Sequence, residues 1–314
     1  MGFVPRSMRL DTVVALLGLA AVLAPATWAQ ADMAEAQRLY NSTAYRDALI
    51  LLRKTPHRTA AELELEGRCR YMMGDFKAAI EAFEKAAHAE PANSDHYLWL
   101  GRAWGRRAET SVFFVAVKYA ANARQNFEKA VELAPGNMEA VNDLFSYYLS
   151  APGFLGGGID RAARLTEIIE RNDPAEYHWA LARIALERKQ YDLAEGQLKK
   201  AIDMAPREIN RIVELAKFLA GQGRIGESEA AFERAASIDP SDKKLLFTRA
   251  ETYVQGRRNL GTAKKPVSYT HLPAASAPPR GTDRRGSAGL ACRPPEASSP
   301  YLDCGALAHT SPRA

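Results

Sequence analysis

Cysteine is scarce in this sequence of 314 residues, which contains three cysteines. Only Cys69 lies between an N-terminal apolar run and a proline-rich C-terminal segment. A single thiol cannot form an intrachain disulfide, so this central part of the chain must be stabilised by packing. A nucleophilic cysteine would need a histidine partner, and the sequence indicates none for Cys69. We therefore interpret Cys69 as a small buried apolar residue.

The sequence also lacks the common motifs of catalytic and metal sites. It contains no HExxH, CxxC or GxSxG motif and no alternating pattern that would predict strands. Its central histidines do not cluster at the short spacing that metal ligands need; they are His57, His88, His96 and His178. We expect no catalytic residues, no metal and no cofactor. The alternative is an enzyme whose active site is assembled from distant residues.

The net positive charge of the chain is unevenly distributed, and its long central region is nearly neutral. The whole sequence has a formal net charge of +5, but residues 32–265 contain 35 basic and 33 acidic residues. A nearly neutral central region gives no support for a nucleic-acid partner. We therefore expect protein or peptide partners and no nucleic acid.

The N-terminus has the pattern of a secretory signal peptide. Arg6 and Arg9 precede an apolar run at residues 13–24, and small residues follow at positions suited to cleavage after Ala29 or Ala31. The run is shorter than the ~20 apolar residues of a membrane-spanning helix. We expect residues 1–31 to be removed and the protein to be periplasmic or secreted, with no membrane span after cleavage.

The central region repeats one pattern. GDFKAAIEAFEKAAHAEPAN, at residues 74–93, returns as ANARQNFEKAVELAPGN, KQYDLAEGQLKKAIDMAPRE and GRIGESEAAFERAASIDPSD. Small, large and small residues at i, i+4 and i+7 form one helical stripe that another helix can approach closely. The prolines that end these helices are Pro91, Pro135, Pro174, Pro206 and Pro240. A second helix precedes each one, and its expected close-contact residues are Gly67, Gly101, Phe145, Ala182, Ala216 and Ala250.

This helix hairpin of about 34 residues resembles the tetratricopeptide repeat. The resemblance implies an all-α fold, a right-handed α-solenoid of helix hairpins, whose surfaces bind proteins. It covers a degenerate helix pair at 32–59, five repeats within 60–242 and a truncated sixth repeat at 243–265. The five repeats are 60–93, 94–137, 138–174, 175–208 and 209–242.

The C-terminal segment, residues 266–314, departs from the repeat pattern. It contains eight of the chain's 17 prolines and no helical stripe. One interpretation is a disordered extension of the native protein. We favour the other, a disordered and non-native tail, because VSYTHL resembles translated linker sequence of the kind that enters through a frameshift or contamination. No function is assigned to Cys292 or Cys304.

The glycine-rich stretch SAPGFLGGGID, at residues 150–160, could be a phosphate-binding loop or a turn. A phosphate loop follows a strand and places a lysine and a hydroxyl at the start of the next helix. Here the preceding residues are helical in pattern, and Ile159, Asp160 and Arg161 follow the glycines. We expect Asp160 to cap the next helix and repel an anion, which favours a turn inside the third repeat.

The best candidate binding surface is the concave groove of the repeats. If the geometry of the family holds, the ninth residue of each unit points into this groove, and four of these six residues are basic. Arginine can grip carboxylates and aromatic rings add contact area, so we expect an acidic segment of a partner to bind there. The predicted partner-binding residues are Arg68, Tyr71, Arg102, Arg106, Asn142, Trp179, Arg183 and Lys217.

Two alternatives to this site stay open. The groove could be a solvated face whose basic residues pair with Glu64 or Glu187. The second repeat also carries an insertion at 106–120, with an apolar stretch around Phe113 and Phe114. It could lengthen both helices, or present an apolar docking site that would make the protein a structural or assembly subunit of an envelope complex, docking there or through its convex face.

Overall fold

The computed structural model describes residues 32–54 and 58–255 of the protein. The expected signal peptide, the C-terminal tail and the end of the truncated sixth repeat lie outside these residues. Secondary structure in the described part is helical, without a strand, which confirms the all-α expectation. The chain divides into two compact units, the first ending at Gly157 and the second beginning at Gly158. Each unit is described by itself.

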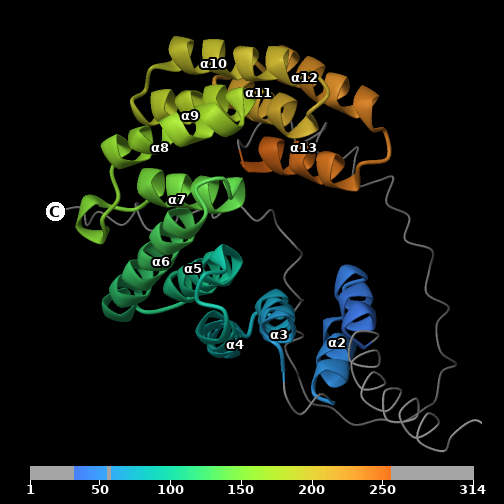
Figure 1. The fold of residues 1–314 in the computed structure, drawn as a ribbon. Coiled ribbons are helices and arrows are strands. Elements are labelled where there is room, and N and C mark those ends of the chain that lie inside the picture. The colour runs from blue at the N-terminus through green and yellow to red at the C-terminus, as the bar shows by residue number, and fades with distance from the viewer. Residues whose placement is uncertain (1–31, 55–57, 256–314) are drawn as a thin grey trace, which may run out of the picture. The chain divides into compact units, whose positions relative to one another are not determined.

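The first unit is a series of helices in which neighbours along the chain pack against each other (Figure 1). A helix over residues 32–41 and α2 form the N-terminal pair, and η1 is a short 3-10 helix. The elements are α2 (Tyr45–Leu52), α3 (Ala60–Met72), α4 (Phe76–Ala89), α5 (Ser94–Glu109), α6 (Phe113–Leu133), α7 (Met138–Ser150) and η1 (Gly153–Leu155).

The second unit contains six helices within residues 158–255. Here α9 packs with α8 and α10, and α11 packs with α10, α12 and α13. The elements are α8 (Ile159–Asn172), α9 (Pro174–Glu187), α10 (Tyr191–Met204), α11 (Ile209–Gly221), α12 (Ile225–Ile238) and α13 (Lys243–Gln255).

Side chains at the repeat boundaries set where the helices begin. The Thr59 hydroxyl and the Glu62 carboxylate form a reciprocal capping box at the start of α3. The side chains of Asn137 and Asp173 accept hydrogen bonds from the first turns of α7 and α9. Pro174 is the first residue of α9, a position where its missing N–H has no intrahelical partner to lose.

Glycine allows the two helices of a repeat to meet closely. A Cβ atom added to Gly67 would lie 2.5 Å from Cε1 of Phe83, and one added to Gly101 would lie 2.5 Å from ring atoms of Phe127. Phe83 and Phe127 are fully buried, so their rings occupy the space that a side chain would need. The small and large stripes of the sequence thus interlock as predicted.

Cys69 lies in the core between α3 and the N-terminal pair. It packs in one cluster with Ala36, Ala48, Leu52 and Leu65. Burial raises the pKa of its thiol to about 11, which keeps the thiol neutral at physiological pH. These features support its interpretation as a small apolar residue.

The insertion of the second repeat lengthens both of its helices. α5 has 16 residues and α6 has 21, whereas α3 and α4 have 13 and 14. The added turns are joined by a small cluster of Ala108, Ala116 and Ala120, against which Tyr119 and Leu155 pack. The lengthened hairpin therefore has a core of its own beyond the repeat core.

The glycine-rich stretch forms the turn between α7 and α8. Gly156 and Gly158 have φ angles of 86° and 142°, which residues with a side chain rarely adopt. A Cβ on Gly157 would lie 1.7 Å from the carbonyl oxygen of Ala151. The prediction that Asp160 caps the helix was wrong: Gly158 occupies the N-cap, α8 begins at Ile159, and Asp160 lies in the first turn.

Candidate binding surface

The first helices of the repeats in the first unit carry a cluster of arginine and aromatic side chains. The guanidinium carbons of Arg68 on α3 and Arg102 on α5 lie 4.7 and 4.8 Å from the ring centroid of Trp99. Tyr71 meets the same indole edge-on at 5.6 Å. Trp99 itself is half-buried, so it is held by its neighbours while part of it faces solvent.

Arg102 is buried and bound to carboxylates of the next repeat. Its Nε donates to Oδ2 of Asp143 at 2.6 Å, and its Nη2 donates to Oε2 of Glu139 at 3.0 Å. Only 5% of Arg102 is exposed. Burial raises the pKa of Asp143 to about 6, although Arg102 acts to lower it. Arg102 therefore links α5 to α7 and positions Trp99, and it does not present a free charge to solvent.

The remaining arginines of this cluster pair within their own helices. Arg68 lies 2.5 Å from Glu64, which also lies 2.7 Å from Nδ1 of the buried His96. Burial would raise the pKa of Glu64, but the hydrogen bond and charge of His96, together with Arg68, lower it below its ordinary value. Arg106 pairs with Glu109 at 2.6 Å and lies over the ring of Phe76. Both Arg68 and Arg106 stay partly exposed.

The other predicted site residues lie on α7, α9 and α11. Asn142 is buried in α7, one turn before Ser146, whose buried hydroxyl has no hydrogen-bond partner among the described residues. In the second unit, Arg183 lies over the ring of Trp179 on α9, at 5.2 Å. Lys217 on α11 is exposed and pairs with Glu214 at 3.0 Å. Five of the predicted residues thus belong to the first unit and three to the second.

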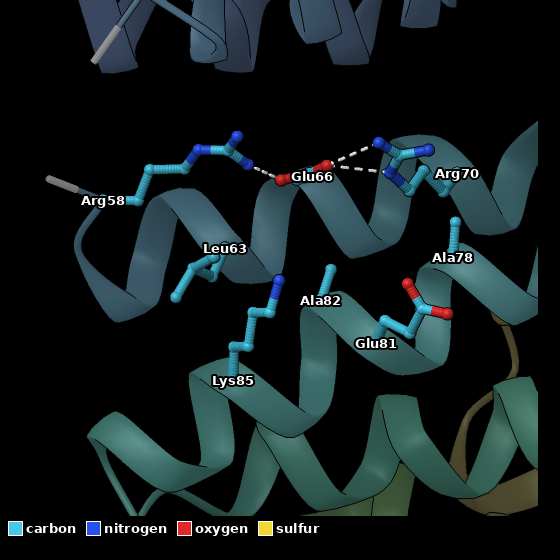
Figure 2. A pocket seen from close by; sticks show the side chains of 8 residues that line it. All are labelled: Arg58, Leu63, Glu66, Arg70, Ala78, Glu81, Ala82 and Lys85. Carbon is cyan, nitrogen blue, oxygen red and sulfur yellow. Dashed lines mark hydrogen bonds and ion pairs between the residues drawn. The ribbon is translucent and has the colours of Figure 1, made fainter. Parts of the chain in front are cut away.

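A separate cleft of about 660 Å³ lies between α3 and α4. Figure 2 shows Glu66 between Arg58 and Arg70, with Lys85 extending from α4 toward α3. Arg70 Nε donates to Glu66 at 2.8 Å, and Arg58 forms an ion pair with the same carboxylate. Two arginines, Arg70 on α3 and Arg58 just before it, thus share the single carboxylate of Glu66. The residues that line the cleft are Arg58, Leu63, Glu66, Arg70, Ala78, Glu81, Ala82 and Lys85.

The described part of the chain contains neither a candidate metal site nor a candidate membrane-spanning helix. Within residues 32–54 and 58–255, no group of three or more histidine, cysteine or acidic side chains could hold a metal ion. Over the same ranges, no helix combines the length and the apolar character needed to cross a bilayer.

Sequence models described as tetratricopeptide repeat match residues 65–109, 156–209 and 212–242. The chain is a tetratricopeptide repeat (TPR) protein. This confirms the resemblance seen in the repeat pattern, and TPR repeats form extended surfaces that bind proteins. A comparison of this TPR protein with curated proteins finds no match.

Solved TPR structures resemble the protein at low sequence identity. A tetratricopeptide repeat protein from Parabacteroides merdae is 15% identical, with a TM-score of 0.55, over 78% of this chain and 94% of that one. A thermophilic TPR protein from Thermus thermophilus is 21% identical, with a TM-score of 0.49, over 61% of this chain and 98% of that one. The likeness to the P. merdae protein shows the fold alone.

Three residues of the TPR surface were missing from the sequence prediction. Trp99 lies three positions before Arg102, so the i, i+3 neighbour rule for helices could have found it. Asp143 and Glu139 lie on the next first helix, 41 and 37 residues after Arg102. No sequence spacing indicates which carboxylates meet across a repeat boundary, so only the structure reveals this pair of contacts.

Proposed function

We propose that this TPR protein is an exported scaffold that binds a partner protein through the arginine and aromatic cluster of its first unit, without catalysing a reaction. The observation that carries the proposal is the half-buried indole of Trp99 beneath the guanidinium groups of Arg68 and Arg102. Rigid aromatic and arginine side chains are enriched among the residues that dominate binding energy at protein interfaces.

The geometry suggests a division of roles within the cluster. Trp99 and Tyr71 supply apolar contact area that is already ordered, so little side-chain entropy is lost when a partner binds. Arg68 and Arg106 are partly exposed, and each can exchange its own glutamate for a carboxylate of the partner. Arg102 acts as a positioning residue, because it is buried and its Nε and Nη2 donate to Asp143 and Glu139.

The preferred partner segment is therefore acidic and carries apolar side chains for the rings. Arg183 and Trp179 in the second unit repeat the same chemistry with one arginine over one indole. Trp179 is buried, with 8% of the residue exposed, so Arg183 is the member of this pair that a partner could reach. Arginine suits such a contact better than lysine, since its planar guanidinium group can stack on a ring and bind a carboxylate at the same time.

Export is part of the proposal and rests on the N-terminal sequence. Residues 1–31 have a basic start, an apolar run and small residues before the expected cleavage site. Fractionation of cells that produce the protein would test this, with N-terminal sequencing of the purified chain. Recovery of uncleaved protein from the cytoplasm would contradict it.

Photo-crosslinking at defined positions tests the binding surface itself. A photoreactive phenylalanine analogue placed at Tyr71 should crosslink one discrete partner in an envelope extract. The same analogue at Glu84, on an exposed part of α4, provides the matched control. A partner captured equally from both positions, or only from Glu84, would contradict the assignment.

A further inference from the structure

The start of α6 presents an apolar tip made of four consecutive residues. The exposed fractions are 73% for Val112, 60% for Phe113, 88% for Phe114 and 40% for Val115. The rings of Phe113 and Phe114 meet edge-to-face, with centroids 5.8 Å apart. We call these residues, Val112–Val115, the apolar tip. So much exposed apolar surface in one short stretch indicates a contact surface.

A packed base supports the apolar tip. Ala116, the next residue of α6, is buried with Ala108 and Ala120, and Tyr119 and Leu155 pack against this small cluster. The lengthened hairpin therefore holds the tip on a helix start rather than on an unsupported loop. This arrangement lets the apolar side chains face outward at no cost to the repeat core.

The segments that flank the apolar tip carry a net positive charge. Within residues 104–120 the only acidic residue is Glu109, and Arg106 pairs with it at 2.6 Å. Arg107 lies over the rings of Trp104 and Tyr119, and Lys118 is exposed one turn after the tip. The first turn of α6 contains no acidic side chain, and its positive dipole end points the same way as the tip.

We propose that the apolar tip inserts into the headgroup region of an anionic lipid bilayer, with Arg107 and Lys118 contacting lipid phosphates. This peripheral contact is independent of the proposed protein-binding surface. A bilayer interface can bind both the apolar tip and the basic residues beside it. Aromatic and aliphatic side chains enter the boundary of the acyl chains, while basic groups stay among the phosphates. A standard protein interface buries about 800 Å² on each partner, a broader area than four consecutive residues supply.

Vesicle flotation tests the proposal. The form to use begins at Asp32, the expected processed chain, because the apolar run at residues 13–24 would itself bind lipid. It should float with vesicles of phosphatidylglycerol mixed into phosphatidylcholine, and much less with phosphatidylcholine alone. Phe113→Ser combined with Phe114→Ser should reduce the bound fraction at least tenfold, and Lys118→Glu should reduce it on the anionic vesicles.

A matched control distinguishes binding by the apolar tip from nonspecific lipid binding by any exposed aromatic ring. Phe247→Ser removes an aromatic ring that is 57% exposed on α13, and this variant should bind vesicles like the wild type. If the double variant unfolds at a lower denaturant concentration, Phe114→Ser alone gives the same test at the most exposed position.

Three results would overturn the proposal. The first is an absence of wild-type binding to the anionic vesicles at low salt, even if the tip crosslinks to a protein instead. The second is unchanged binding by the phenylalanine variants. The third is equal binding to neutral and anionic vesicles, which would remove the role of the basic residues.

Discussion

Arg102 Nε donates to Asp143 Oδ2 at 2.6 Å, joining α5 to α7 across 41 residues of sequence. Comparable contacts join the first helices of other repeats. His96 lies 2.7 Å from Glu64 between α5 and α3, and in the second unit Arg211 lies 2.9 Å from Glu176 between α11 and α9. Polar side chains on these helices thus connect consecutive repeats. The side chains that make these connections are less available to bind a partner.

Loss of Arg102 should destabilise the fold. Arg102→Ala leaves Asp143 buried without its cation, which costs about 3–5 kcal/mol for a broken buried pair. Urea denaturation of the variant and the wild type measures this. Lys77→Ala, at an exposed position of α4, should change the free energy of unfolding by no more than about 0.5 kcal/mol.

A double substitution shows whether the loss of stability comes from leaving Asp143 without its cation. Arg102→Met with Asp143→Leu replaces both charges by apolar groups, and it should recover most of the stability that Arg102→Ala loses. Equal stability of Arg102→Ala and the wild type would show that the pair does not hold α5 against α7.

The stability that Asp143 contributes should fall as the pH rises. Burial raises the pKa of Asp143 from 3.8 to about 6 in the folded chain. Between these values the folded state binds more protons than the unfolded state, so the free energy of unfolding decreases with rising pH in that window. Two pKa units correspond to about 3 kcal/mol.

Comparison with Asp143→Asn isolates this effect from other carboxylates. The unfolding free energy of the wild type minus that of the variant should decrease by up to about 3 kcal/mol between about pH 4 and about pH 7. The lowered pKa of Glu64 acts in the opposite direction but is common to both proteins. A difference that is constant or increases with pH would mean that Asp143 is ionised throughout.

Glycine should be required at the close contacts between helices and replaceable at an open position inside a helix. Gly101→Ala would place a methyl group 2.5 Å from the ring of Phe127, and overpacking of this kind costs about 1–3 kcal/mol. Gly196, inside α10, has no atom within 4 Å of an added Cβ. Gly196→Ala should stabilise the protein by about 0.5–1 kcal/mol. Thermal unfolding distinguishes the two, and similar effects would contradict the packing account.

The repeat fold could be predicted from the sequence because it depends on local spacing. Small residues such as Gly67 and Gly101 and the large residues Phe83 and Phe127 recur at fixed intervals, and those intervals determine which helix faces meet. The glycine turn was predicted for the same reason, apart from its N-cap, where Gly158 replaced the expected Asp160.

The candidate surface could be predicted only in part. Repeat register placed Arg68 and Arg102 on first helices, but it could not show that one stays partly exposed while the other is buried. That difference depends on Asp143 and Glu139, which lie more than a full repeat later in the chain. Pairing across repeats is a tertiary property, and no alternation or periodicity encodes the choice of partner.

The most direct test of the binding surface is the affinity of the crosslinked partner for matched charge variants. Arg68→Gln with Arg106→Gln removes two partly exposed cations of the surface, and Lys77→Gln with Lys85→Gln removes two exposed cations from α4. Isothermal titration calorimetry should show at least a tenfold weaker Kd for the arginine variant and an unchanged Kd for the lysine variant. Equal affinities of both variants and the wild type would contradict the proposal that this surface binds the partner.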